Sequence, residues 1–213
     1  MNTSPRDDAS GVSGTPGHHR FASLVPSASR RSFLRRGVLV AGAGVAAGGG
    51  YLAYRAGEGR QLVFAALGEA MQEVERLSAA GVSALEPATA WNWSQTLVHC
   101  AQSIEYSLSG FPAPRSVLFQ NTLGAAAFHV FALRGRMNHN LAEPIPGAPA
   151  LDAAVPDASA ALVRLRQAVQ GFAIHAGPLH PHFAYGPLSK VQYEQAHAMH
   201  LANHLSAFEV RGG

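Results

Sequence analysis

Apolar residues recur at helical spacing through most of the chain after residue 60. Charged residues separate the apolar positions of the segment 60–80, which are Leu62, Ala65, Ala66, Met71 and Val74. Apolar positions spaced in this way, with charged residues between them, are typical of a helix. No stretch of any length alternates apolar and polar residues with the period of two that a half-buried strand requires. The pattern therefore predicts an all-α fold.

Capping residues and helix breakers indicate where the other helices begin and end. Asn92 with Gln95, and Ser189 with Gln192, have the spacing of a capping box. The segment 135–156 contains four prolines and is predicted to be a loop or a crossover. The predicted helices span residues 60–80, 92–110, 116–134, 157–176 and 189–210. Long helices joined partly by long crossovers are typical of an antiparallel four-helix bundle, here with one additional helix.

The first 56 residues have the composition of a leader followed by an export signal. Residues 1–28 are rich in Ser, Pro, Gly and Asp and lack a hydrophobic period, which predicts a disordered leader. Residues 29–56 begin with Ser-Arg-Arg-Ser-Phe-Leu-Arg, in which Arg30 and Arg31 form the pair, and continue into an uncharged run. The string resembles a twin-arginine signal. The resemblance implies the twin-arginine translocation machinery as a partner and a periplasmic or exported location.

A membrane anchor is the alternative interpretation of the uncharged run. Residues 37–54 just reach the length that spans a bilayer, so an uncleaved signal would anchor the protein in the inner membrane, facing outward. Six glycines in this run make a poor helix. A cleaved signal is therefore the favoured interpretation.

The positive charge of the chain belongs to this amino-terminal segment. The net charge is +3, but the first sixty residues hold eight arginines against three acidic residues. The remainder has eight basic and ten acidic residues, so the basic footprint of a nucleic-acid-binding domain is missing from it. We therefore expect no nucleic-acid partner. A single cysteine, Cys100, excludes an internal disulfide and is interpreted as a small buried apolar residue.

The last predicted helix has a face of histidines. At 100° per residue, the residues Tyr193, His197, His200, His204 and Phe208 fall within an arc of about 80°. His200 and His204 are one turn apart, so both imidazoles can reach one metal ion. A packed or solvated histidine face is the alternative. A zincin protease is excluded because Leu201, rather than glutamate, follows the first histidine of the pair.

The second predicted helix offers a third ligand. One of its faces is polar but uncharged, with the residues Gln95, His99, Gln102, Ser103 and Tyr106. Such a face is typical of a partly buried polar cavity, although a surface face in a charge-poor protein has the same composition. His99 is the best candidate on it.

Three segments, taken in order, resemble a known family. They are WSQTLVHCAQSIEYS at 93–107, HPHFAYGPLS at 180–189 and MHLANHL at 199–205. Over about residues 61–210 the chain is similar to the domain-of-unknown-function family 1569, in the DinB-like superfamily of helical bundles. The resemblance implies that His99, His200 and His204 bind one divalent metal ion, with solvent completing the coordination.

Three protein ligands with one open position are typical of a catalytic metal site. Imidazole ligands are compatible with zinc, nickel or iron. The leading hypothesis is a metal-dependent hydrolase or transferase acting on an unidentified small molecule. The alternatives are a non-catalytic metal- or ligand-binding protein of the cell envelope, or an interaction module whose histidines merely pack. A homodimer is compatible with each of these hypotheses.

Four side chains are predicted to surround the open position: His197, Gln102, Tyr106 and Tyr193. His197 is a candidate for an alternate ligand or a proton shuttle, and equally for a core histidine. Among the other histidines, His129 and His175 are predicted to be plain helix residues. His180 and His182 either gate the cavity or make turn contacts.

Overall fold

The computed structural model describes residues 60–151 and 157–211. The long helices of this part are α2 (Leu67–Ala80), α3 (Trp93–Ser109), α6 (Ala158–Ile174) and α7 (Lys190–Leu205). Between α3 and α6 lie α4 (Val117–Phe119), the π-helical segment η3 (Gln120–Gly124) and α5 (Ala125–Arg134). The fold is mostly helical, so the predicted all-α class is confirmed. The predicted leader and the signal segment with Arg30 and Arg31 lie outside the described residues.

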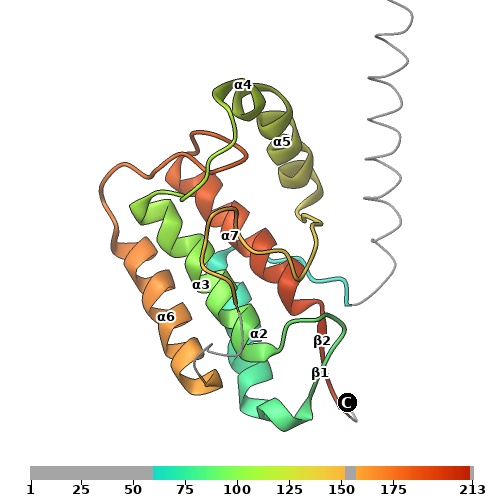
Figure 1. The fold of residues 1–213 in the computed structure, drawn as a ribbon. Coiled ribbons are helices and arrows are strands. Elements are labelled where there is room, and N and C mark those ends of the chain that lie inside the picture. The colour runs from blue at the N-terminus through green and yellow to red at the C-terminus, as the bar shows by residue number, and fades with distance from the viewer. Residues whose placement is uncertain (1–59, 152–156, 212–213) are drawn as a thin grey trace, which may run out of the picture. The chain divides into compact units, whose positions relative to one another are not determined.

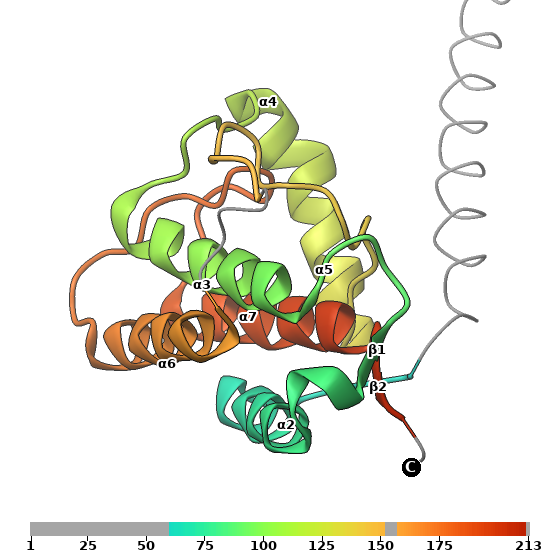
Figure 2. The same ribbon diagram turned by 60° about the horizontal axis from the view of Figure 1, so that its bottom comes forward.

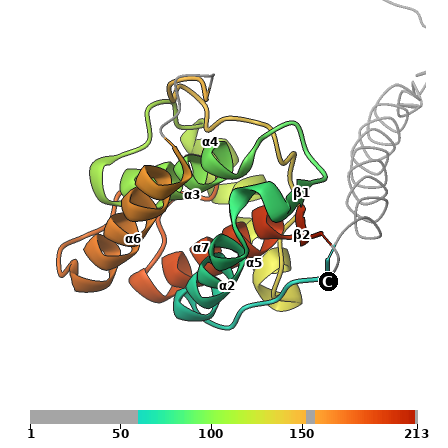
Figure 3. The same cartoon turned by 90° about the horizontal axis from the view of Figure 1, so that it is seen from below.

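The four long helices share one hydrophobic core. Each contributes fully buried aliphatic side chains, represented by Val74, Leu97, Leu165 and Leu201. Burying one such side chain contributes about 1.5–3 kcal/mol to stability. Figure 3 shows α6 beside α3 and α2 beside α7. None of the helices in the described ranges is long and apolar enough to cross a membrane.

The capping residues hold the starts of α3 and α7 as predicted. Asn92 accepts a hydrogen bond from the Gln95 backbone N–H, and the Gln95 side chain accepts one from the Asn92 N–H, each at 2.9 Å. Ser189 and Gln192 form the same reciprocal pair before α7. Both capping boxes are thereby confirmed, and they fix the first turns of the two helices that present histidines.

Helices α3 and α6 run in the same direction, whereas an antiparallel bundle was expected. Arg164 of α6 pairs with Glu105 of α3 at 2.6 Å. Further towards the C-terminal ends of both helices, Gly171 of α6 faces Leu108 of α3, so residue numbers increase in the same direction along the two helices. The connection between them is long enough to return to the starting end, because it contains α4, α5 and an irregular loop (Figure 1). Helix α7 is antiparallel to α3.

The last helix is shorter than predicted. It ends at Leu205, and residues Phe208–Val210 form strand β2, which pairs antiparallel with β1 (Leu85–Pro87). Phe208 contacts the Trp93 ring edge-on at a centroid distance of 5.0 Å. Each strand has only three residues, which is too short to produce a recognisable alternation of apolar and polar positions.

The predicted helix 116–134 contains a π-helical interruption. The Ser116 side chain caps α4, but η3 separates α4 from α5 at Gln120–Gly124. Gln120 faces the loop before α7 and donates its side-chain N–H to the Phe183 carbonyl at 3.2 Å. Helix α5 lies beside α7, and both α4 and α5 lie away from α6 (Figure 2).

Candidate metal centre

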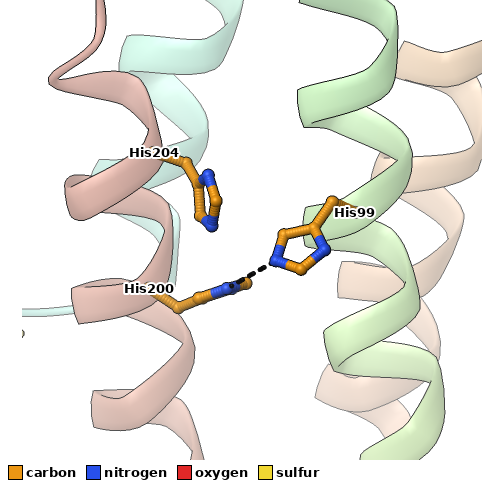
Figure 4. Close-up of side chains that lie close together, drawn as sticks. All are labelled: His99, His200 and His204. Atoms are coloured by element: carbon orange, nitrogen blue, oxygen red, sulfur yellow. Dashed lines mark hydrogen bonds between the residues drawn. The ribbon is translucent and has the colours of Figure 1, made fainter. Parts of the chain in front are cut away.

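Helices α3 and α7 bring His99, His200 and His204 together. Their ring centroids lie 4.6–5.0 Å apart, and one nitrogen of each lies within 4.8 Å of the others. The closest pair is His99 Nε2 and His200 Nε2, at 3.2 Å (Figure 4). Because His200 and His204 are one turn apart on the same face of α7, a single residue of α3 can meet both.

These three side chains are buried, with 2%, 9% and 1% of their surface exposed. His99 Nδ1, His200 Nδ1 and His204 Nε2 have no hydrogen-bond partner. Leaving a buried polar atom unpaired costs about 1–3 kcal/mol. A cluster of such atoms is therefore retained at a cost to stability, which points to a functional role.

Burial keeps the three imidazoles neutral. It lowers the pKa of His99 to about 3 and holds the pKa of His200 and of His204 well below the ordinary value of 6.5. Neighbouring rings of the triad lower the pKa of His200 and of His204 further, because two neighbouring imidazolium ions would repel. Neutral imidazole is the form that binds metal ions.

The residues present fit a divalent metal ion. Zinc–nitrogen bonds of about 2.0–2.1 Å in a tetrahedron put neighbouring ligand nitrogens about 3.3 Å apart. The 3.2 Å between His99 Nε2 and His200 Nε2 matches this spacing. The donor set is made entirely of imidazole nitrogens, which suits zinc, nickel or iron and disfavours calcium or magnesium.

A cavity of about 210 Å³ adjoins the triad. His99, Ser103, His197 and His200 line it from α3 and α7. The loop after α5 contributes a largely apolar wall of Met137, Pro144, Ile145 and Pro146. Charged and aromatic residues complete the lining, namely Arg115, His139, Glu143, His182, Phe183, Tyr185, together with Ala196. The volume suits a small metabolite.

His197 lines this cavity but does not join the triad. Its Nε2 lies 3.3 Å from Ser107 Oγ, whose own hydrogen goes to the Ile104 carbonyl at 2.6 Å. His197 Nε2 therefore carries a hydrogen and donates it to Ser107. Burial lowers the pKa of His197 to about 3. The structure thus places this histidine in a satisfied packing role at the cavity wall.

The other three predicted neighbours are not at the cavity. The Tyr193 hydroxyl donates to the His180 carbonyl at 2.6 Å, and burial raises the pKa of Tyr193. Gln102 is buried on α3, and Tyr106 contacts Phe111, but neither lines the cavity. The helical spacing in the sequence placed these residues on the correct helices. Whether each side chain faces the cavity depends on the loops that pack over it, and the spacing does not reveal their paths.

His182 makes the turn contact that was one of the two alternatives, and it also lines the cavity. Its Nδ1 accepts hydrogen bonds from the Ala184 and Tyr185 backbone N–H groups, both at 3.2 Å, which is a turn contact. The neutral ring then carries its hydrogen on Nε2, and burial lowers its pKa to about 3. The residue also lines the cavity, where this N–H is a hydrogen-bond donor.

His139 is the residue at the centre that sequence reasoning missed. Its ring lies 5.1 Å from His200 and 4.8 Å from His204, centroid to centroid. It comes from the proline-rich segment predicted as a loop, so a helical face cannot reveal it. The only available signal was a histidine within a loop long enough to return over the bundle.

The remaining candidates behave largely as predicted. Cys100 is buried in the core, and burial raises its thiol pKa. His129 is exposed on α5, whereas His175, also predicted to be a helix residue, lies just after the end of α6. Trp93 is a core residue, whereas Trp91 covers the triad, with its ring 4.8 Å from His99 and 6.1 Å from His204.

Comparison with known proteins identifies the family. The model of a family described as a protein of unknown function, DUF1569, matches residues 56–211. The chain therefore belongs to the DUF1569 family. No curated protein and no solved structure matches it significantly.

Proposed function

We propose that this chain is an exported protein whose helical domain holds one divalent metal ion through His99, His200 and His204 and acts as a metal-dependent hydrolase or transferase. The observation that carries the proposal is a group of three buried histidines whose possible ligand atoms lie within 4.8 Å of one another. Each of these histidines also has a nitrogen without a hydrogen-bond partner. The resemblance of the chain to DinB-like bundles supports the same ligand set. When bound, the ion supplies Lewis-acid chemistry.

The cavity beside the triad supports a small-molecule substrate. His182 offers an N–H donor at its wall, and Arg115 adds a positive charge, so an oxygen-rich or anionic group can be oriented there. Met137 and Ile145 provide apolar surface, which reduces access of water to the same space. Groups of both kinds around one cavity are typical of ligand sites.

Metal content is the test of the ligand set. We expect the full chain, purified without chelator or histidine tag, to retain close to one zinc, nickel or iron per chain by mass spectrometry. The double variant His200→Ala/His204→Ala should lose nearly all of it and His99→Ala most of it, because each removes imidazoles that the helices hold in position around the ion. His129→Ala is the matched control, since this histidine is exposed, and it should retain the metal.

A parent protein that contains no metal and takes up no added zinc or nickel would overturn the metal proposal. If metal is retained, turnover of ester, phosphoester, amide and thiol-acceptor substrates separates the enzyme from the alternative, a non-catalytic metal-binding protein of the cell envelope. Metal retention without turnover of any of these classes supports that alternative.

Export is proposed from the sequence of residues 29–56. Replacing Arg30 and Arg31 by lysine keeps the charge but removes the guanidinium pair, and the two side chains are not interchangeable in recognition. We expect this double variant of the full chain to accumulate in the cytoplasm, as measured by cell fractionation. Arg35→Lys with Arg36→Lys is the matched control and should still be exported. Undiminished export of the first variant would contradict the twin-arginine interpretation.

A further inference from the structure

His139 is held in place beside α7 although it lies in an irregular loop. Asn203 of α7 donates its side-chain N–H to the His139 carbonyl at 3.5 Å. Two residues earlier, Met137 is buried in a small cluster that includes Phe128 and Met199. The loop is thus anchored to α5 and α7 at His139 itself and two residues before it.

The His139 ring approaches two triad members as closely as they approach each other. Its centroid lies 4.8 Å from His204 and 5.1 Å from His200, compared with 4.7 Å between those two rings. The distance to His99 is longer, at 6.5 Å. His139 therefore lies across the centre from His99, with the α7 pair between them.

The hydrogen bonding of His139 leaves a lone pair free. Its Nδ1 lies 2.9 Å from the Asn140 carbonyl oxygen. A carbonyl only accepts, so Nδ1 carries the hydrogen and Nε2 carries the lone pair. Nε2 is buried and has no hydrogen-bond partner. His204 Nε2 is likewise buried without a partner, and its ring lies 4.8 Å from that of His139, so one ligand can serve both nitrogens.

We infer that His139 is a fourth imidazole ligand of the metal centre, bound through Nε2 when no substrate is present. The inference rests on the proposed metal site. The carbonyl bond to Nδ1 is the kind of supporting contact that orients a metal-binding histidine. Because His139 is on a loop and the other three are on helices, it is the ligand that a substrate in the cavity displaces. A site of four protein ligands is closed, and loss of one opens it.

Cobalt(II) spectroscopy of the full-length protein tests this ligand directly. In the variant His139→Cys, a thiolate would take the place of the imidazole, and cobalt binding should produce an intense near-ultraviolet thiolate-to-cobalt charge-transfer band. The wild type should lack the band, although it contains Cys100. His129→Cys is the matched control, because it adds a cysteine at an exposed site on α5, and it should also lack the band.

The affinity of His139→Ala for zinc provides a second measurement. We expect it to fall about tenfold or more, since even the loss of a supporting residue costs 10- to 100-fold. Two results together would overturn the inference that His139 is a ligand: cobalt bound to His139→Cys gives no charge-transfer band, and His139→Ala binds zinc as tightly as the wild type. The proposed site of three histidines would stand in that case. Failure of the wild type to bind cobalt or zinc would overturn the proposed function and this inference with it.

Discussion

The metal-free protein is expected to lose its stability steeply as the pH falls from 6.5 to 5. Burial lowers the pKa of His99, His182 and His197 to about 3. Below pH 6.5 these residues take up protons in the unfolded chain but not in the folded one, so acid favours unfolding. Each contributes about 1.4 kcal/mol per pH unit, so the three together cost about 6 kcal/mol at pH 5. A total stability of about 5–15 kcal/mol leaves little margin.

Urea unfolding midpoints between pH 7.5 and 5 measure this loss. Two replacements keep one hydrogen bond each: His182→Asn supplies an acceptor for the backbone N–H groups, and His197→Gln supplies a donor to Ser107. Each replacement should reduce the slope of the unfolding free energy against pH by about 1.4 kcal/mol per pH unit. Exposed His129→Gln should not change it. A midpoint that does not move with pH would contradict the buried neutral histidines.

Saturating zinc should shift the same transition to lower pH. The ion binds neutral imidazole, so protons and metal compete for His99, His200 and His204. Ligand that binds the folded state alone stabilises it by mass action. The pH at which the protein unfolds with and without zinc thus reports on the centre independently of any activity.

The second large effect is expected from Gly124→Ala. The backbone of Gly124 is helical, with φ −64° and ψ −51°, so alanine would ordinarily be favoured by about 1 kcal/mol. Here the added methyl carbon would lie 1.9 Å from the Ala184 carbonyl oxygen. Relief of this overlap requires movement of the loop that carries His182. We expect a loss of about 3 kcal/mol or more in the free energy of unfolding, the upper part of the range for overpacking.

Gly171→Ala in α6 is the matched control for this substitution. There an added methyl carbon would meet only the Leu108 side chain, at the ordinary distance of 3.7 Å. We expect the stability to stay the same or to rise by up to about 1 kcal/mol. Chemical denaturation of both variants gives the comparison. Equal stability of the two variants would show that the close approach at Gly124 has no energetic weight.

The parts of the fold that depend on local chemistry were predictable from the sequence. Asn92 and Ser189 cap α3 and α7 because their side chains bond to backbone N–H groups three residues away, a contact that a short sequence window contains. The spacing of His200 and His204 likewise follows from helix geometry alone. The juxtaposition of His99 with this pair was predicted through the family resemblance.

The parts that depend on contacts between distant segments were not predictable. The position of His139 depends on Asn203, 64 residues further along the chain, and on burial of Met137. The parallel direction of α6 depends on the path of the whole connection. The strand pair joins Leu85 to Val210, and three residues on each side carry too little pattern to reveal the pairing.

The site has two tasks, holding the metal ion and enclosing a ligand, and the crossover between α3 and α6 contributes mainly to the second. His99, His200 and His204 lie on helices whose positions are fixed by the shared core, whereas Met137 and Ile145 belong to a connection outside those helices. Substitutions at positions such as Ile145 can therefore reshape the space for a ligand without touching the helices, whereas Met137 also anchors the segment that carries His139. The architecture allows selectivity to diversify while the three histidines on the helices stay in place.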